Sequence, residues 1–387
     1  KERKMKLKKI MLIFLLLFLV LGQVVRAESQ EEVLESQKQS LNISEFTKEA
    51  EQYTKEAFPD LNIGEVLNSA ISGNIDNEQM VTGIFSLLGT EVKTAITTLG
   101  SILVIVILHS ILKTISEYTE NKSIGQISYY IQYILIVGLV MHNFTDIVQM
   151  TRESVQNLVG FNYTLIPLLI TLLLTTGSMV SVSIMEPVLL FLITFLGNLI
   201  SNVIIPIVLA ATVLGIVSQL SDKVQIDKIA KFFKSSVGWI LGVVLTIFVG
   251  VLSLEGTLGS TVDGLTAKTT KAAVSNFIPV VGKVLGDAVD TVLGCANILK
   301  NAVGIVGVII IIGICILPII KLATLTIFYH LTAALCQPIA DGKIVKLLEQ
   351  MGDTFKILLA IVCSVSVMLI IGITLVVRIS NSGMMYR

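Results

Sequence analysis

The sequence predicts an all-α, polytopic integral membrane protein, and three observations lead to this prediction. Of its 387 residues, 53% are hydrophobic and only 14% are charged, whereas about a quarter of the residues of a soluble domain carry charge. Several uncharged runs are long enough to cross the ~30 Å hydrocarbon core of a bilayer as helices. From Ser154 to Ser221 the only formally charged residue is Glu186. We therefore expect seven or eight transmembrane helices, amphipathic interfacial helices and a cleaved N-terminal signal peptide.

Residues 1–27 have the layout of a signal peptide. A basic stretch precedes the uncharged run Ile10–Leu21, and small residues follow around Ala27. Twelve apolar residues are too few to span a bilayer at about 1.5 Å per residue. We expect cleavage near Glu28, and the alternative is an uncleaved membrane anchor.

Residues 28–94 form an acidic region that is expected to be exported and helical. It holds thirteen acidic residues and four lysines. Asn42 and Glu45 have capping-box spacing, which predicts a helix that ends before Pro59. A second short amphipathic helix is expected to close near Gly73. The region either docks a partner or acts as a solvated spacer.

Residues 95–254 form the first membrane region, with spans 1–6, and residues 303–378 form the C-terminal membrane region, with spans 7 and 8, before a short tail at 379–387. The stretch Pro187–Ser218 is interrupted near Asn202 and Pro206, so it is either one bent span or two short ones. If this stretch forms two spans, ten Lys/Arg residues lie on the cytoplasmic side and seven lie outside. If it forms one span, eight lie on the cytoplasmic side and nine lie outside. The positive-inside rule therefore favours eight. The other spans are Ala95–Leu112, Ile127–Val148, Tyr163–Val180, Val237–Leu254, Val303–Ile320 and Ile357–Val377, and the cytoplasmic amphipathic segments are Ser221–Ser236 and Ile339–Phe355.

Residues 255–302 form a polar outer segment that holds the first candidate functional residues. The part Gly256–Thr270 is expected to be a loop, and a helix is expected after Pro279. One face of this helix carries charge and another carries a seam of glycines, which allows a second backbone to approach closely. The helix either lies flat on the outer membrane surface or lines a water-filled path between subunits. The candidate path-lining or contact residues are Lys283, Asp287, Asp290, Gly282, Gly286 and Gly294.

Glu186 is a further candidate, because a carboxylate within apolar sequence is often functional in membrane proteins. The alternative is structural. Pro187 follows it directly, and if proline begins a helix there, the helix dipole favours an acid at that position.

No catalytic motif indicates an enzyme. The sequence contains no HExxH, GxSxG or Walker A motif, and its three histidines are scattered. The four cysteines lie in or beside hydrophobic stretches and are expected to be buried small residues. Gly286–Asp287 is similar to the aspartate motifs of intramembrane proteases, but its possible partners Asp263 and Asp290 lie in the same polar segment. We expect no cofactor, no metal and no nucleic acid.

The second half of the chain carries a set of specific segments, namely Thr246–Leu254, Val262–Gly264, Ile278–Gly282, Asp287–Leu293, Leu299–Gly304, Pro318 and Gln337–Asp341. These segments resemble the stage III sporulation protein AE family, and the likeness extends over nearly the whole chain. One departure is Gln337, where an acidic residue is expected before the proline.

This resemblance implies a non-enzymatic membrane subunit of the channel, or feeding tube, that joins mother cell and forespore in endospore-forming bacteria and is needed for late forespore development. The implied location is the mother-cell membrane surrounding the forespore. The implied partners are other proteins of the same sporulation operon, including a secretion-type ATPase, small membrane proteins and ring-forming proteins.

Two other classes of function remain open from the residues alone. A self-contained secondary transporter would bind its substrate near the broken helices at Pro187 and Pro206. A membrane-embedded assembly scaffold would recruit partners through the acidic residues 28–94.

Overall fold

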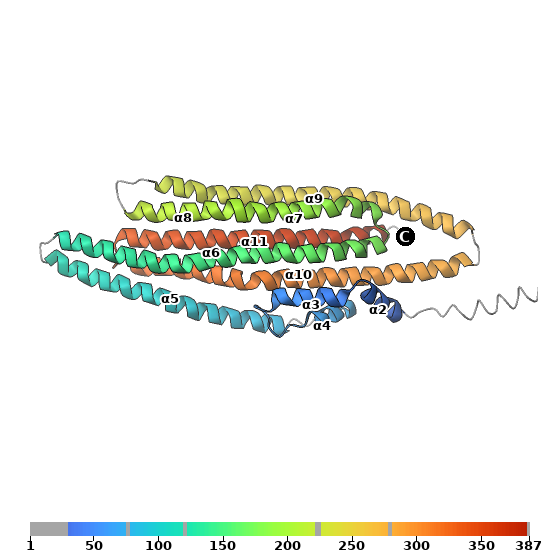
Figure 1. Ribbon diagram of the computed structural model, residues 1–387, viewed down its shortest axis with the longest axis horizontal. Helices are drawn as coiled ribbons and strands as arrows, with labels where there is room; N and C mark the ends of the chain where they lie inside the picture. Colours follow the sequence, from blue (N-terminus) through green and yellow to red (C-terminus); the bar gives the residue numbers. More distant parts are fainter. Residues whose placement is uncertain (1–29, 75–77, 119–121, 221–225, 278–280, 385–387) are drawn as a thin grey trace, which may run out of the picture.

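The computed structural model describes residues 30–74, 78–118, 122–220, 226–277 and 281–384. These residues form three short N-terminal helices and six long helical rods that lie side by side along one axis (Figure 1). The predicted signal peptide lies outside the described residues. The helices are α2 (Gln30–Ser40), α3 (Ile43–Thr54), α4 (Ile63–Ser72), α5 (Glu78–Tyr118), α6 (Lys122–Thr175), α7 (Met179–Leu199), the π-helix η1 (Ile200–Ile204), α8 (Ile205–Leu220), α9 (Asp227–Phe277), α10 (Val281–Cys336) and α11 (Gly342–Met384).

The prediction of an all-α, multi-span membrane protein is confirmed, although the number of long helices differs from the seven or eight spans expected. Within the described ranges, six helical stretches are long and apolar enough to cross a membrane. They are Met80–Leu108, Tyr133–Thr175, Met179–Gln219, Asp227–Leu254, Asp290–Cys336 and Gly342–Arg378.

The first difference lies in α6, which replaces two expected spans. The sequence suggested separate helices at Ile127–Val148 and Tyr163–Val180, but the chain is one continuous helix from Lys122 to Thr175. Between the expected spans, Gln149, Glu153, Gln156 and Asn157 are exposed on one side of this helix. The other side keeps a buried apolar row that includes Val155, Leu158 and Phe161, so the helix has a packing surface along its whole length.

The second difference lies at Pro187–Ser218, where the two short spans that the charge count favoured are a single interrupted rod. The interruption is the π-helix η1, in which the Ile205 N–H donates to the Ile200 carbonyl. Pro206 has no N–H and leaves the carbonyl four residues earlier without its usual donor. A π turn accommodates this locally.

The polar outer segment also differs from expectation. The expected loop Gly256–Thr270 is helical and belongs to α9, which runs to Phe277. Of the expected interfacial segments, residues 227–236 begin α9 and residues 342–355 begin α11. Helix α6 and the α7–α8 rod each replace two expected spans, so the number of passes falls by two. Because the fall is an even number, the later helices keep the direction along the bundle that eight spans predict. The ends of α5, α8 and α10 therefore lie together at one end of the bundle, and those of α6 and α9 at the other (Figure 1).

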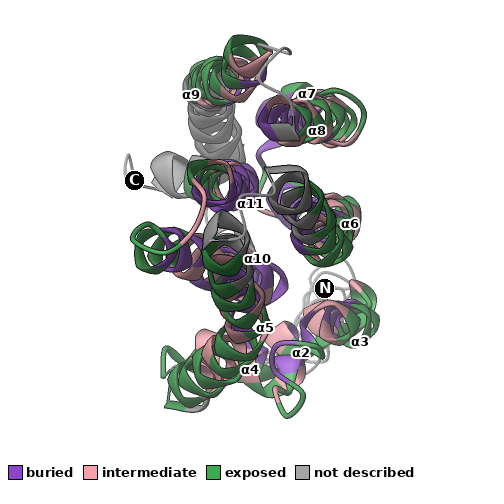
Figure 2. Cartoon of the chain, turned by 90° about the vertical axis from the view of Figure 1, so that its left-hand side faces the viewer, coloured by how far each residue is buried: buried purple, intermediate pink, exposed green. Residues whose placement is uncertain are grey.

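Helix α10 is the centre of the bundle. It packs most extensively on α11 and also contacts α6, α5 and the three N-terminal helices, and buried residues gather around it (Figure 2). Three glycines let neighbours approach closely. A Cβ at Gly307 would lie 2.7 Å from Leu165 Cδ2, one at Gly313 would lie 2.8 Å from Thr54 Cγ2, and one at Gly304 would overlap Val377. Small residues of this kind drive helix association in membranes.

The acidic N-terminal region packs on the bundle. Phe46 and Tyr53 of α3 contact the ring of Phe161 on α6, with ring centroids 6.3 and 5.7 Å apart. The Gln37 side chain donates to the Val292 carbonyl at 3.1 Å. Helix α4 is capped as the sequence suggests, with Gly73 in the left-handed conformation at its end. Asn42 is the N-cap of α3, as the spacing predicts, but its side chain makes no capping hydrogen bond.

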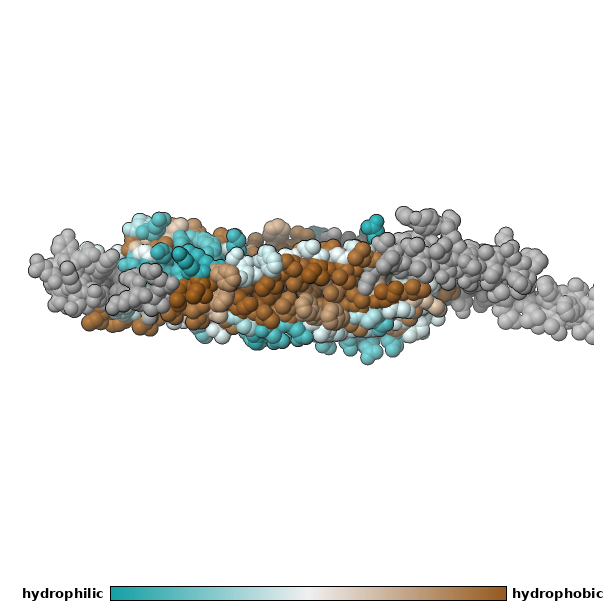
Figure 3. Space-filling model, turned by 90° about the horizontal axis from the view of Figure 1, so that it is seen from above, coloured by the Kyte–Doolittle hydropathy of each residue, from teal (hydrophilic) through white to brown (hydrophobic). Residues whose placement is uncertain are grey.

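The outer surface of the bundle is mainly apolar over its middle. Viewed over α7, α8 and α9, hydrophobic side chains cover most of the face (Figure 3). Residues such as Phe191, Trp239 and Ile247 are more than half exposed there. An exposed apolar surface of this extent is what lipid covers.

The close approach at Gly307 predicts a stability effect. Replacing Gly307 by valine is expected to lower the free energy of unfolding by about 1–3 kcal/mol, because the added carbons overlap Leu165. Thermal unfolding in detergent micelles, followed by circular dichroism, measures this. Gly242→Val is the matched control, since a Cβ at Gly242 on α9 meets nothing within 4 Å. Equal stability of the two variants would contradict the packing described for α10.

Candidate functional site

The residues predicted for the polar outer segment lie at the start of α10. Gly282, Lys283, Gly286 and Asp287 are in its first two turns, and their side chains lie outside the described ones. Asp290 is half-buried. A Cβ at Gly294 would meet nothing within 4 Å, so no neighbour approaches closely at this end of the predicted seam. The glycines in close contact are those further along α10.

Glu186 lies inside α7, in its second turn. Pro187 does not begin this helix, because α7 starts at Met179, so the structural reading of Glu186 as a helix-start carboxylate is wrong. The side chain is half-buried. Helices α6 and α11 separate α7 from α10 (Figures 1 and 2), so Glu186 and Asp290 do not form one site.

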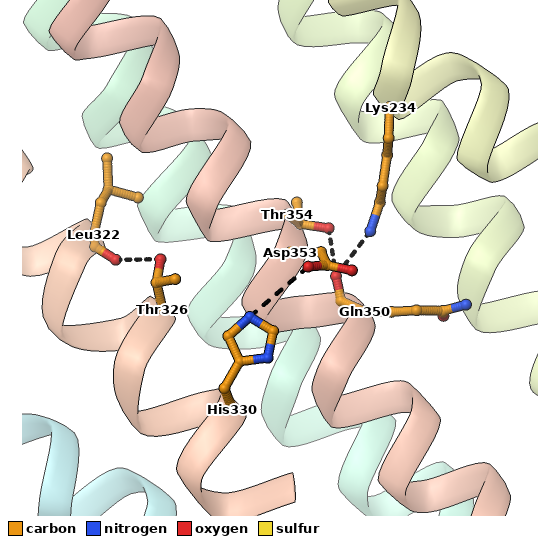
Figure 4. Close-up of polar contacts among 7 residues, drawn as sticks. All are labelled: Lys234, Leu322, Thr326, His330, Gln350, Asp353 and Thr354. Carbon is orange, nitrogen blue, oxygen red and sulfur yellow. Dashed lines mark hydrogen bonds and ion pairs between the residues drawn. The ribbon is translucent and has the colours of Figure 1, made fainter. Parts of the chain in front are cut away.

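A different group of polar residues does come together, at the end of the bundle where α8 ends and α9 and α11 begin (Figure 4). We call it the interhelical polar cluster. It joins four long helices, and its members are Thr212 on α8, Asp227 and Lys234 on α9, His330 on α10, and Gln350, Asp353 and Thr354 on α11.

Gln350 connects α9 and α11. The Lys234 Nζ donates to the Gln350 carbonyl at 2.8 Å, and the Gln350 Nε2 donates to Asp227 Oδ1 at 3.0 Å. Asp227 also pairs with Lys231 one turn later, at 3.1 Å. Hydrogen bonds in which one partner is charged are stronger than neutral ones. These contacts fix the position of α9 relative to α11.

His330 and Thr212 extend the cluster to two further helices. The His330 Nε2 lies 3.8 Å from Asp353 Oδ1, and both side chains are partly exposed. The hydroxyls of Thr212 and Thr354 lie 3.2 Å apart, and Thr354 also donates to the Gln350 carbonyl. Two glycines make room for these contacts, since a Cβ at Gly352 would lie 2.9 Å from His330 Nε2 and one at Gly215 would lie 2.9 Å from Gln350 Oε1.

The chemistry available in this cluster is hydrogen bonding and ion pairing between helices. Among the residues that the structure describes, no group of three histidine, cysteine or acidic side chains is placed to hold a metal ion. A polar network with most of its members paired stabilises one arrangement of the helices against others. The cluster therefore defines how α8, α9, α10 and α11 meet.

The sequence contains the polar residues of the cluster but does not show that they meet. Lys234 lies in the expected cytoplasmic amphipathic segment Ser221–Ser236, and Gln350 and Asp353 lie in the expected segment Ile339–Phe355. Their function as interhelical contacts depends on which faces of α9 and α11 meet, and spacing along one helix does not give this. The buried Lys300, whose Nζ has no hydrogen-bond partner among the described residues, was likewise expected in the outer segment.

A bundle of six long apolar helices with polar contacts between them defines a multi-pass helical membrane protein. Its sequence matches the family described as stage III sporulation protein AE over residues 61–380. The chain belongs to the stage III sporulation protein AE family. It is 32% identical over 310 residues to the stage III sporulation protein AE of Bacillus subtilis (strain 168), which covers 80% of this chain and 78% of that protein. No solved structure matches the chain.

The contact between Lys234 and Gln350 gives a second prediction. Lys234→Met is expected to lower the free energy of unfolding by about 1–3 kcal/mol, because a charge-assisted hydrogen bond between α9 and α11 is lost. Thermal unfolding in nanodiscs measures the effect. Lys228→Met, an exposed position on the same helix, is the control and is expected to change little. If both variants unfold like the parent protein, the cluster does not join these helices.

Proposed function

We propose that this chain is a non-enzymatic membrane subunit of the sporulation channel, or feeding tube, that links mother cell and forespore and is needed for late forespore development. The observation that carries the proposal is family membership over residues 61–380, together with six helices able to cross a membrane. Interhelical polar contacts join these helices.

The proposed location is the mother-cell membrane surrounding the forespore. The proposed partners are the other proteins of the same operon, including a secretion-type ATPase, small membrane proteins and ring-forming proteins. The acidic N-terminal helices support a contact function on the exported side. They are packed against α10 and α6 and so present a fixed surface to a partner.

Within this function, we assign to the start of α10 a contact or path-lining function on the side facing the forespore. The charged positions are Lys283, Asp287 and Asp290, in the part of α10 that follows α9 in the chain. Helix α2 packs near this part of α10, where Gln37 donates to the Val292 carbonyl, and α3 and α4 lie further along the bundle (Figure 1). A partner on the exported side would therefore meet both elements together.

The third prediction tests this function in sporulating cells. Deleting the chain is expected to block late forespore development, and supplying the full chain is expected to restore it. Asp287→Lys with Asp290→Lys is expected to restore it poorly, because the reversed charges oppose a partner selected for the native ones. Heat-resistant spore counts and co-purification of the operon partners measure the two effects.

The matched control is Lys228→Glu with Lys346→Glu, a double charge reversal at exposed positions near the starts of α9 and α11, at the other end of the bundle. It is expected to restore spore formation. Normal sporulation without the chain would overturn the proposed function itself. Normal sporulation and assembly with the α10 reversal would overturn only the function assigned to the start of α10.

A further inference from the structure

An open groove of about 380 Å³ lies between the start of α3 and the last part of α6, two helices that pack on each other. One wall carries Leu41, Glu45 and Glu49, from α3 and the turn before it, and the other carries Thr164, Leu168 and Thr171 of α6. The residue steps from Thr164 to Thr171 correspond to about 10 Å of helix. The volume of this groove is in the range of binding pockets, and it has room for a few side chains.

Aromatic contacts fix the two walls of the groove relative to each other. Phe46, which also lines the groove, is buried, and its ring centroid lies 6.3 Å from that of Phe161 on α6. Tyr53, further along α3, lies 5.7 Å from the same ring. Gly160 leaves room for the Tyr53 hydroxyl, since a Cβ there would lie 3.3 Å from it. The groove is therefore formed before a ligand arrives, which lowers the entropy cost of binding.

Two polar residues of the groove are not used for helix capping. The sequence predicts that Asn42 and Glu45 form a capping box, but Asn42 adopts the left-handed conformation and its side chain makes no capping hydrogen bond. Its carbonyl accepts from the Glu45 N–H at 2.9 Å. Among the described residues, the carboxylates of Glu45 and Glu49 make no hydrogen bond or ion pair. Both carboxylates are therefore available to a ligand.

The two carboxylates favour a cation. They lie one turn apart on α3, where Cβ atoms are separated by about 5–6 Å, and both residues are exposed. Lys48 lies between them in the sequence but does not line the groove, and no lysine or arginine is among the described residues that do. A bound lysine or arginine would reduce the repulsion between Glu45 and Glu49 and would form charge-assisted hydrogen bonds with them.

The α6 wall combines hydrogen-bond acceptors with apolar surface. The Thr164 hydroxyl has no partner within the described ranges. Thr171 donates to the Pro167 carbonyl at 2.8 Å, so the Thr171 oxygen can still accept. Pro167 has no N–H, so the Tyr163 carbonyl lacks its usual helical donor. Leu168 is half-buried and adds apolar contact. This lining suits a cationic donor on an apolar stem, which is the form of the lysine and arginine side chains.

We propose that the groove docks a short basic segment of a partner protein, whose lysine or arginine side chains meet Glu45 and Glu49 while an apolar side chain meets Leu168. The inference rests on the proposed contact function of the N-terminal helices, and it names the site and the chemistry of that contact. Lipid fits the groove less well. An acyl chain would leave the two carboxylates without a partner, and an anionic headgroup would be repelled by them.

Binding of a designed peptide tests the proposal. The probe is a short fluorescein-labelled peptide that alternates pairs of lysine and leucine, and the comparison peptide has glutamate in place of lysine. Fluorescence anisotropy measures binding to the full chain in phosphatidylcholine nanodiscs, with empty nanodiscs as the blank. Glu45→Gln with Glu49→Gln is expected to weaken binding of the basic peptide at least about fivefold, because two charge pairs are lost. Glu56→Gln with Asp60→Asn is the control, with the same change in charge at exposed positions outside the groove.

A second variant tests the groove without changing its charge. Thr171→Trp fills the space between the walls and is expected to weaken binding to a similar extent. Leu174→Trp, at an exposed position of α6 that does not line the groove, is its control. Circular dichroism verifies that each variant is folded. If Thr171→Trp does not fold, Thr164→Lys replaces it and is expected to weaken binding by placing a competing cation beside the carboxylates.

Preference for the basic peptide, with losses in the groove variants and not in their controls, supports docking. Equal binding of the two peptides overturns the proposal, as does unchanged binding when the groove is filled. Equal losses in the two charge variants also overturn it and indicate diffuse attraction to the acidic region. Peptide binding is measured on the isolated chain and spore formation in cells, so failure of the groove and failure of the proposed function are separate results.

Discussion

The close packing around α10 is the constraint on which the rest of the structure depends. In lipid, apolar side chains gain little by leaving one helix surface for another, so association relies on van der Waals contact and interhelical hydrogen bonds. Gly304, Gly307 and Gly313 provide that contact on three sides, towards α11, α6 and α3. The N-terminal helices are thereby fixed to the helix at the centre of the bundle.

Polar groups are distributed unevenly around this packed centre. At one end they tie α8, α9, α10 and α11 together, and at mid-height they lie on the outside of α6. The first arrangement determines how the helices of one chain meet. The second gives α6 an exposed polar surface between its buried contacts with the neighbouring helices. Membership of the stage III sporulation protein AE family is consistent with both.

The sequence was sufficient for the class of fold, because uncharged runs and helix signals such as Gly73 depend on local chemistry. It was insufficient where the packing of one helix face decides whether a helix continues or which residues meet. The polar residues after Val148 suggested a break, but the buried row through Leu158 keeps α6 continuous. The low helix propensity of Gly256–Thr270 suggested a loop, yet α9 continues through it, since tertiary context overrides propensity. Lys234 and Gln350 meet because one particular face of α9 packs against one particular face of α11. The spacing of residues within either helix does not reveal which faces pack together.

The π turn at Ile200–Ile204 sets the orientation of everything that follows it in the α7–α8 rod. It holds one residue more than an α-helical turn, so α8 is rotated by about 100° relative to a straight continuation of α7. That rotation decides which side of α8 carries Thr212 towards Thr354. The π turn in the middle of the α7–α8 rod therefore determines how the helices are aligned at the end of the bundle that holds the interhelical polar cluster.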